Sequence, residues 1–477
     1  MELWKYPKSL HQGKNEKNGI AEAIPFLSCP TMFSYREAPF ALPLFLGNLL
    51  QALYNAVDML VVGRIVGETG LAAISNASML CYIINSLGLG LTMGGAVLAA
   101  QFKGAGDAQG QRDCVSMLLF ASLSASVLVT FAGLAACEPV FRALYVPADA
   151  YDDACEYMKA ICWGTVFVFG YNAVCSALKG LGDSVTPLYI VAAAAVINIA
   201  LDILFVGPLA LGTVGAAYAT VAAQGVAFVA SLAYLRRREP AFAPGRSGLR
   251  WELLPDILRL GLPTAVQMAV VNAAYLLMTG MLNQFGTAVA AASGVGLKIN
   301  TFAGMHCWAI GQAITAMAGQ CIGAGEMERA RETAKTGLRL NLTVTLVVVT
   351  AVQLLAEPLV RLFDDSEQVV RDGVLYLRLC CGANSLVYAA MYTLDSFAIG
   401  VGAPKVALLN ALLDALLIRL PAAWLLAWPM GLGLPGLYLA QAISPVLPAL
   451  VGTIYFKSRA WERKRPASPI DEYYDIY

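Results

Sequence analysis

The chain has 477 residues, of which 58% are hydrophobic and only 13% are charged, and its mean hydropathy is +0.64. A soluble globular protein is about 45–50% apolar and about 25% charged, so this composition excludes water as the main solvent and indicates an integral membrane protein. The 32 basic and 32 acidic residues give a formal net charge of zero, which argues against a nucleic-acid partner.

The chain opens on a polar or mixed segment, residues 1–37, which we expect to be a cytoplasmic N-terminal tail. It lacks the basic region, apolar core and small-residue cleavage site of a secretory signal. Met32 is a candidate for the true start, because the first apolar run opens shortly after it. Peptides beginning at Met1 in the native protein would reject that start.

Twelve apolar segments follow, each long enough for the approximately 20 residues of a spanning helix. Their approximate bounds are 38–62, 71–99, 114–137, 153–177, 187–208, 214–235, 260–284, 288–318, 332–355, 373–397, 406–428 and 434–456. We therefore predict an all-α integral membrane protein with twelve transmembrane helices.

Lys and Arg are distributed unequally between alternate loops. The richer set of loops and the C-terminal tail contain Lys103, Arg112, Lys179, Arg236, Arg237, Arg238, Arg246, Arg250, Arg259, Arg329, Arg331, Lys335, Arg339, Lys405, Lys457, Arg459, Arg463, Lys464 and Arg465. The opposite loops contain only Arg64, Arg142, Arg361 and Arg371. Basic loops stay on the cytoplasmic side, so both termini are predicted to be cytoplasmic.

The two halves of the chain repeat at an offset of about 220 residues. Gln101–Asp107 (QFKGAGD) reappears as Gln320–Glu326 (QCIGAGE), and Ser176–Gly182 (SALKGLG) reappears as Ser396–Gly402 (SFAIGVG). Each half holds an even number of spans, six, so both enter the membrane with the same orientation. Repeated bundles of this kind bind substrate near the midplane and alternate access by rocking.

The predicted organisation is therefore two six-helix lobes with tails and a connecting loop. The segments are the N-terminal tail 1–37, the N-terminal lobe 38–235, a cytoplasmic loop 236–259, the C-terminal lobe 260–456 and a cytoplasmic tail 457–477.

Polar residues inside the first-half spans are candidates for function, because a charge at a helix centre costs about 2.5–3.5 kcal/mol on insertion scales. Tyr54 and Asp58 lie four residues apart on span one, and Asn198 and Asp202 four apart on span five, so each pair shares a helix face. The other polar groups expected in this pocket are Asn172 and Thr220.

Two carboxylates in one pocket could bind and release a proton. Alternatively, the oxygens of Asp58, Asn198 and Asp202 could hold sodium, since hard cations prefer oxygen ligands. A third interpretation is that Asp58 is solvated near the outer end of its helix, and that both carboxylates only cap or pack.

The second half is not a copy at these positions. Its intramembrane charges are Asp395, Asp414 and Arg419, and the last two lie five residues apart, roughly adjacent in direction. They could form a structural pair within the lobe. Alternatively, Asp395 or Asp414 faces a cavity that attracts cationic substrates, with Gln267 and Asn272 on span seven lining it.

Catalytic or nucleotide-binding motifs are not evident. His11 and His306 leave little for histidine-based chemistry, the eleven cysteines have no metal-ligand spacing, and Walker A, HExxH and GxSxG motifs are missing. We expect no cofactor apart from a coupling ion.

Four segments resemble the multidrug and toxic compound extrusion (MATE) family in its prokaryotic branch, and the resemblance runs from about Pro39 to Phe456. The segments are Leu42–Arg64, Gly104–Asp107, Leu178–Pro187 and Asn198–Asp202. The resemblance implies a bacterial or archaeal inner-membrane antiporter with two six-helix lobes. It would export organic cations and drugs in exchange for protons or sodium.

The resemblance also carries the family's cation site onto residues of the first lobe. The matching positions are Tyr54, Asp58, Asn198, Asp202 and Thr220, with Asn172 chosen for the span-four Asn. The branch with a second-lobe sodium site has a Glu on span seven, whereas Gln267–Asn272 (QMAVVN) contains no carboxylate. Coupling is therefore expected in the first lobe, in a monomer whose partners are organic cations and membrane lipid.

Two alternative functions have weaker support in the sequence. A flippase for lipid-linked oligosaccharide, from the same superfamily, needs a strongly basic central cavity, and only Arg419 and Lys298 could contribute to one. A polytopic membrane enzyme needs a nucleophile and base or paired catalytic carboxylates, and the scarcity of histidine opposes it. We therefore expect a transporter and not an enzyme.

Overall fold

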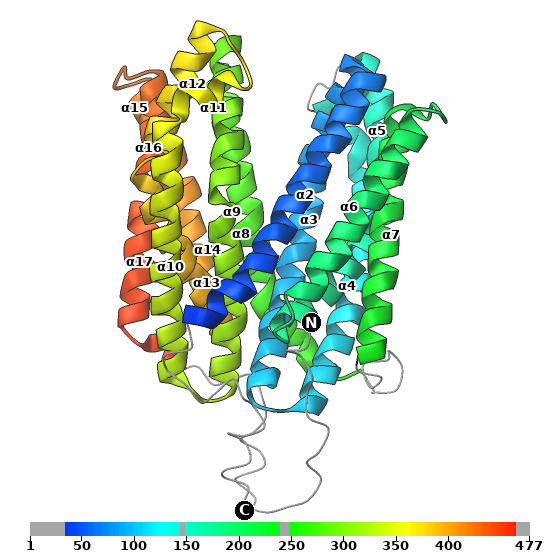
Figure 1. Ribbon diagram of the computed structural model, residues 1–477, viewed down its shortest axis with the longest axis vertical. Helices are drawn as coiled ribbons and strands as arrows, with labels where there is room; N and C mark the ends of the chain where they lie inside the picture. The colour runs from blue at the N-terminus through cyan, green and yellow to red at the C-terminus, as the bar shows by residue number, and fades with distance from the viewer. Residues whose placement is uncertain (1–33, 144–147, 239–248, 464–477) are drawn as a thin grey trace, which may run out of the picture.

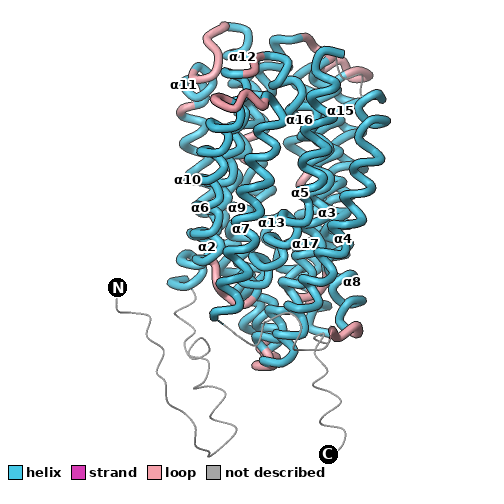
Figure 2. Tube along the Cα trace, turned by 90° about the vertical axis from the view of Figure 1, so that its right-hand side faces the viewer, coloured by secondary structure: helices cyan, strands magenta, loops and turns pink. Residues whose placement is uncertain are grey.

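The computed structural model describes residues 34–143, 148–238 and 249–463, and these residues form helices without strands. The first six helices, which we call the N-lobe, are α2 (Ser34–Ile65), α3 (Glu68–Gly104), α4 (Ala108–Ala143), α5 (Ala148–Gly180), α6 (Val185–Val206) and α7 (Gly212–Arg238). They run roughly along the long axis of the molecule, as Figure 2 shows.

The second half, which we call the C-lobe, has more breaks in its helices. Its elements are α8 (Leu253–Asn283), α9 (Thr287–Gly323), α10 (Met327–Leu354), α11 (Ala356–Arg361), α12 (Glu367–Cys380), α13 (Asn384–Gly400), α14 (Pro404–Leu412), the π-helical turn η3 (Leu413–Arg419), α15 (Leu420–Ala427), α16 (Leu434–Ile443), α17 (Val446–Lys457) and the 3₁₀ turn η4 (Ala460–Arg463).

Each predicted span coincides with a helix or a short series of helices. Within the described residues, ten spans are long and apolar enough to cross a membrane, and the pair α12 and α13, bent by 49°, makes an eleventh. The remaining predicted span is α9, which has 37 residues. At about 1.5 Å per residue, this helix is longer than the hydrocarbon core of a bilayer is thick. It packs against α2, α3, α10, α12 and α13, so protein covers much of it and its composition can be less apolar.

Large apolar side chains cover the outside of the bundle. Leu128, Val196, Leu354 and Ile454, on four different helices, are between 66% and 78% exposed. Leaving such side chains in water costs about 25 cal/mol per Å² of apolar surface, whereas lipid tails accept them. The exterior therefore has the character of a lipid-facing surface.

The two lobes stand side by side and diverge toward one end, as Figure 1 shows. They touch through α3 against α8 and α9, and through α2 against α9. We call the end at which α3 and α9 terminate the closed end. Because these two helices end at Gly104 and Gly323, the two copies of the repeated Gly-Ala-Gly sequence meet there.

Glycine permits this close approach. A Cβ atom on Gly104 would lie 1.8 Å from the carbonyl oxygen of Gln320, and one on Gly323 would lie 1.8 Å from the carbonyl oxygen of Gln101. The Gln320 side chain of the C-lobe also donates a hydrogen bond of 2.9 Å to the carbonyl oxygen of Gly180 in the N-lobe. Backbone thus meets backbone across the lobes at the closed end.

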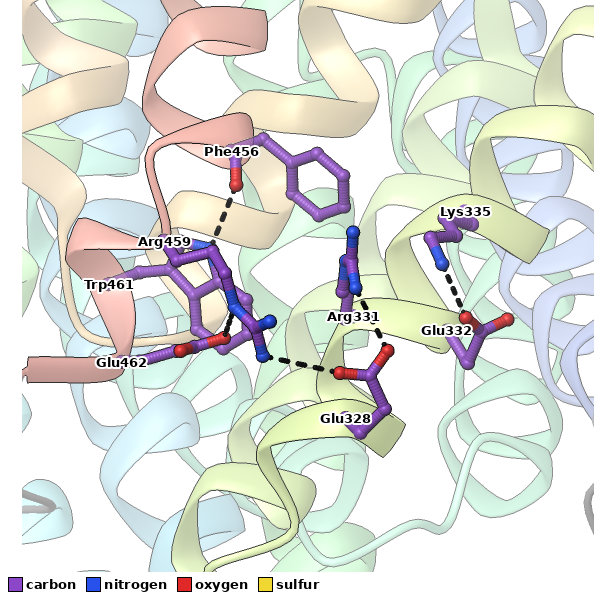
Figure 3. Close-up of polar contacts among 8 residues, drawn as sticks. All are labelled: Glu328, Arg331, Glu332, Lys335, Phe456, Arg459, Trp461 and Glu462. Atoms are coloured by element: carbon purple, nitrogen blue, oxygen red, sulfur yellow. Dashed lines mark hydrogen bonds and ion pairs between the residues drawn. The ribbon is translucent and has the colours of Figure 1, made fainter.

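The residues just after α17 fold back onto the C-lobe, as Figure 3 shows. Trp461 is fully buried and its indole Nε1 donates to the carbonyl oxygen of Phe456 at 3.2 Å. Arg459 bridges Glu462 and Glu328, the latter on α10 at 3.3 Å. The start of the predicted C-terminal tail is therefore docked. Residues 464–477 lie outside the described residues, as do Met32, most of the N-terminal tail and positions 239–248 of the predicted central loop.

Candidate functional site

Two carboxylates from different helices face each other in the N-lobe. Asp58 lies in the last two turns of α2 and Asp202 in the last turn and a half of α6, and they are 7% and 0% exposed. Their carboxyl groups are close enough to share a proton in a hydrogen bond. We call these two residues the carboxylate pair. Its burial disagrees with the interpretation in which Asp58 is solvated.

Polar side chains from neighbouring turns surround the carboxylate pair. Tyr54 lies one turn before Asp58 and is 8% exposed, and Asn198 lies one turn before Asp202 and is 2% exposed. The Asn198 amide donates to the hydroxyl of Thr220 on α7 at 3.4 Å. The four-residue spacing in α2 and α6 places each polar residue on the face of its carboxylate.

The oxygens of this cluster lack hydrogen-bond donors. Oδ1 of Asp58, both carboxylate oxygens of Asp202 and Oδ1 of Asn198 are buried, and none has a hydrogen-bond partner among the described residues. Ionised carboxylates can only accept hydrogen bonds, and buried charges without partners are strongly unfavourable. The cluster therefore calls for a proton or a small cation.

Span four contributes a different residue from the one predicted. Tyr157 on α5 is 6% exposed and lies close to Asp58, Asp202 and Tyr54, whereas Asn172 comes 15 residues later (172 − 157) on the same helix. At about 1.5 Å per residue this puts Asn172 about 22 Å nearer the closed end. No spacing pattern within span four marks Tyr157, because its place in the cluster depends on how α5 packs against the other helices.

The structure also brings Gln224 of α7 to this cluster, next to Tyr54. Its Oε1 atom is buried and has no hydrogen-bond partner among the residues described. Gln224 lies one helical turn beyond Thr220, so the spacing in the sequence already puts both on one face.

The C-lobe contains a separate charged cluster in which every charge has a partner. Asp395 accepts a hydrogen bond of 2.6 Å from the side-chain amide of Asn410. Arg419 forms an ion pair of 2.5 Å with Asp414 and donates from Nε to the hydroxyl of Ser444 at 3.3 Å. Asp414 and Arg419 are each 3% exposed, so the structural pair considered from the sequence does form.

A π-helical turn makes this pairing possible. In an α-helix, residues five apart point about 140° away from each other, so the expectation that Asp414 and Arg419 are adjacent was wrong for regular geometry. The π-turn Leu413–Arg419 joins residues five apart through its backbone hydrogen bonds and so aligns them. Pro421 lies two residues after Arg419, and a proline inside a helix disturbs the preceding turn.

The two polar residues predicted on span seven lie elsewhere. Asn272 donates a hydrogen bond of 3.0 Å to the hydroxyl of Ser86 in the N-lobe. The Oε1 atom of Gln267 is buried without a hydrogen-bond partner among the described residues. In the described part of the chain neither residue forms a hydrogen bond with Asp414 or Arg419.

A two-lobed helical bundle with a lipid-facing exterior and buried ionisable groups in each lobe defines a class of membrane transporter. The MatE family model matches residues 43–204 and 263–425, one region in each lobe. The chain belongs to this family, which is the MATE family of membrane transporters. The two matched regions also agree with the repeat and the all-helical fold predicted from the sequence.

Curated relatives match over nearly their full length. The chain is 28% identical over 430 residues to the probable multidrug resistance protein YpnP of Bacillus subtilis, which covers 89% of this chain and 94% of that protein. It is 25% identical over 432 residues to the probable multidrug resistance protein NorM of Thermotoga maritima, covering 89% and 92%.

Solved structures share the fold at lower identity. An outward-facing multidrug resistance MATE transporter superimposes with a TM-score of 0.84 at 23% identity. A transporter of the MOP superfamily from Pyrococcus furiosus, described as having a binding pocket of reversed polarity, gives 0.84 at 24% identity. Each comparison covers 91% of this chain and 97% of the other.

Proposed function

We propose that this protein is a secondary active antiporter that exports organic cations, including drugs, in exchange for protons or sodium. Alternating access of the two lobes would move the substrate. Relatives described as multidrug resistance proteins support the substrate class. The flippase alternative has less support, because Arg419, one of its two candidate basic residues, is neutralised by Asp414.

The observation that carries this proposal is the carboxylate pair of the N-lobe. Two buried carboxylates with donor-free oxygens are stabilised when a cation enters between them and destabilised when it leaves. A proton would bridge Asp58 and Asp202. Sodium would take oxygens from Asp58, Asn198 and Asp202, which fit a hard cation.

Ion binding drives transport only if the ion binds one lobe arrangement more tightly than the other. Asp58 and Asp202 lie on α2 and α6, and α2 also packs on α9 of the C-lobe. A shift of α2 on ion binding would therefore reach the interlobe contact. A membrane potential adds about 2.3 kcal/mol per charge for each 100 mV.

The distribution of basic residues gives the orientation in this proposal. Lys103 and Lys179 lie in the last turns of α3 and α5, next to the Lys- and Arg-rich loops of the closed end. Basic loops stay cytoplasmic, so the closed end would face the cytoplasm of a bacterial inner membrane, with both termini on that side. A pathway between the lobes of one chain is complete in a monomer.

The test is ethidium efflux from proteoliposomes under a proton gradient and a sodium gradient imposed separately. Wild-type protein should export ethidium under at least one gradient, and Asp58→Asn should abolish gradient-driven export because it removes one of the two charges. Asp153→Asn is the matched control, since Asp153 lies in the same lobe but accepts its hydrogen bond from Thr213.

Full ethidium export by folded Asp58→Asn protein would overturn the coupling role of the carboxylate pair. Folded wild-type protein that exports ethidium under neither gradient would overturn the assignment of organic cations as substrates.

A further inference from the structure

The side chain of Arg419 is held in the C-lobe as a bound ligand would be. Its guanidinium pairs with Asp414 at 2.5 Å and donates to the Ser444 hydroxyl at 3.3 Å, and its Cζ atom lies 5.0 Å from the centroid of the Tyr275 ring. A carboxylate, a hydroxyl and an aromatic face are the groups with which proteins bind organic cations.

Arg419 does not use all the hydrogen-bonding capacity of this site. Its Nη1 atom and Oδ1 of Asp414 are buried, and neither has a hydrogen-bond partner among the described residues. Arginine and carboxylate side chains frequently pair through two parallel hydrogen bonds. Here one atom of each partner is left over, and both could bind a second molecule.

The pair also depends on the backbone conformation of the π-turn. Asp414 and Arg419 are aligned by the π-turn η3. If this turn adopted α-helical geometry, the two side chains would point about 140° apart and separate. A local rearrangement of one turn could therefore withdraw Arg419 from Asp414 while the transmembrane span stays helical.

Tyr275 connects this site to the contact between the lobes. Asn272, three residues earlier on α8, donates to Ser86 of the N-lobe at 3.0 Å, and residues three apart share a helix face. Tyr275 therefore lies on the face of α8 that turns toward the N-lobe, and it is half-buried. The Tyr275 ring therefore lies between Arg419 and the contact with the N-lobe.

We propose that Asp414, Tyr275 and Ser444 form a binding site for a monovalent organic cation, and that Arg419 is its built-in occupant, displaced by the exported cation. This inference rests on the proposed export of organic cations and names a substrate site for it. In the empty transporter Arg419 neutralises Asp414. A substrate with a positive charge on a planar or aromatic body competes for the carboxylate and the ring.

The test uses purified full-length protein in lipid nanodiscs, with methylguanidinium, the head group of arginine, as the probe. Arg419→Ala leaves Asp414 without its partner, so millimolar methylguanidinium should raise the Tm of this variant in a saturable way. Wild-type protein, in which the probe must displace Arg419, should need at least about tenfold more probe for the same shift. Arg419→Ala/Asp414→Ala should show no shift.

Two controls separate specific binding from ionic strength and folding effects. Sodium chloride at equal concentration should not reproduce the shift, nor should the probe stabilise Arg250→Ala, which breaks the more exposed ion pair with Asp113 at 3.5 Å. If Arg419→Ala cannot be purified, Arg419→Met keeps most of the side-chain volume and replaces it in the same test.

Equal shifts in the single variant and in Arg419→Ala/Asp414→Ala would overturn the proposed site, as would the absence of any saturable shift in folded Arg419→Ala or Arg419→Met. The binding assay requires no ion gradient, so its result is separate from the efflux test. Methylguanidinium binding with no ethidium efflux would count against the proposed function alone. Efflux without such binding would count against this site alone.

Discussion

The N-lobe and the C-lobe each bury carboxylates in the membrane but neutralise them differently. In the N-lobe, Asp58 and Asp202 face each other with oxygens that have no donor among the described residues. In the C-lobe, Asp414 is paired with Arg419 of its own helix. Asp414 therefore has a positively charged partner from the chain itself, whereas Asp58 and Asp202 face another carboxylate.

This difference shows which properties of a repeat persist when its two copies diverge. The backbone contacts at the closed end occur twice, at Gly104 and at Gly323, with the same 1.8 Å approach. The charged clusters have no such correspondence. The copies thus share the helix packing that joins the lobes, whereas each lobe has its own arrangement of charged side chains.

The largest expected effect separates the two lobes by function. Asp202→Asn should lower gradient-driven ethidium efflux at least about tenfold, equivalent to about 1.4 kcal/mol, because it removes half of the carboxylate pair. Asp395→Asn, in the C-lobe, should stay within about threefold of wild type, since Asn410 already holds this residue. A greater loss in Asp395→Asn than in Asp202→Asn would place coupling in the C-lobe.

The second effect is on stability, and a loss of stability is expected in the C-lobe but not in the N-lobe. Asp414→Ala leaves the buried Arg419 charge unpaired, which should destabilise the protein by about 3–5 kcal/mol, whereas Asp414→Ala/Arg419→Met should recover most of the loss. Asp58→Asn removes one of two facing carboxylates and should leave the Tm unchanged or higher. Thermal unfolding in nanodiscs measures the Tm of all three variants. A lower Tm in Asp58→Asn would mean that the carboxylates of both lobes stabilise the protein in the same way.

The third effect concerns the contact that the two copies share. Gly104→Ala and Gly323→Ala each put a methyl group against backbone, an overpacking that should cost about 1–3 kcal/mol and loosen the closed end. Hydrogen–deuterium exchange at the ends of α3 and α9 should rise by similar amounts in both variants. Gly304→Ala on α9, where a Cβ meets nothing within 4 Å, is the matched control. Strongly unequal responses would show that only one copy of the contact closes the lobes.

The smallest effect lies within the N-lobe cluster. Thr220→Val removes the hydroxyl that accepts from Asn198 at 3.4 Å. A hydrogen bond contributes about 0.5–1.5 kcal/mol, so the ion concentration for half-maximal efflux should change by about two- to tenfold. Thr213→Val, on the same helix but bonded to Asp153, should leave it unchanged. Equal changes in both variants would remove Thr220 from the ion site.

Much of the fold was predictable because a bilayer imposes simple rules on sequence. Spans must be about 20 apolar residues long, and the repeat divides them into two sets of six. The rule of apolar composition is least reliable for α9, because other helices surround it and separate it from lipid. In α2 and α6 the four-residue spacing also predicted which polar residues share a face with Asp58 and Asp202.

The parts of the site that were not predicted depend on contacts between helices, which produce no pattern in the local sequence. Tyr157 joins the N-lobe cluster only because α5 runs antiparallel to α6 at a depth that span counting does not give. The π-turn that aligns Asp414 with Arg419 departs from regular helical spacing. The approach of Tyr275 and Ser444 to Arg419 joins three segments far apart in the chain. Polar partners across helices require the packed structure.

The contact at the closed end has a bearing on how such a chain arose. Gly104 meets Gln320 and Gly323 meets Gln101, so each repeat unit presents the same two positions to the other, as the subunits of a symmetric dimer do. The geometry is what an ancestral homodimer would have had before its gene was duplicated and fused, after which each half became free to mutate alone.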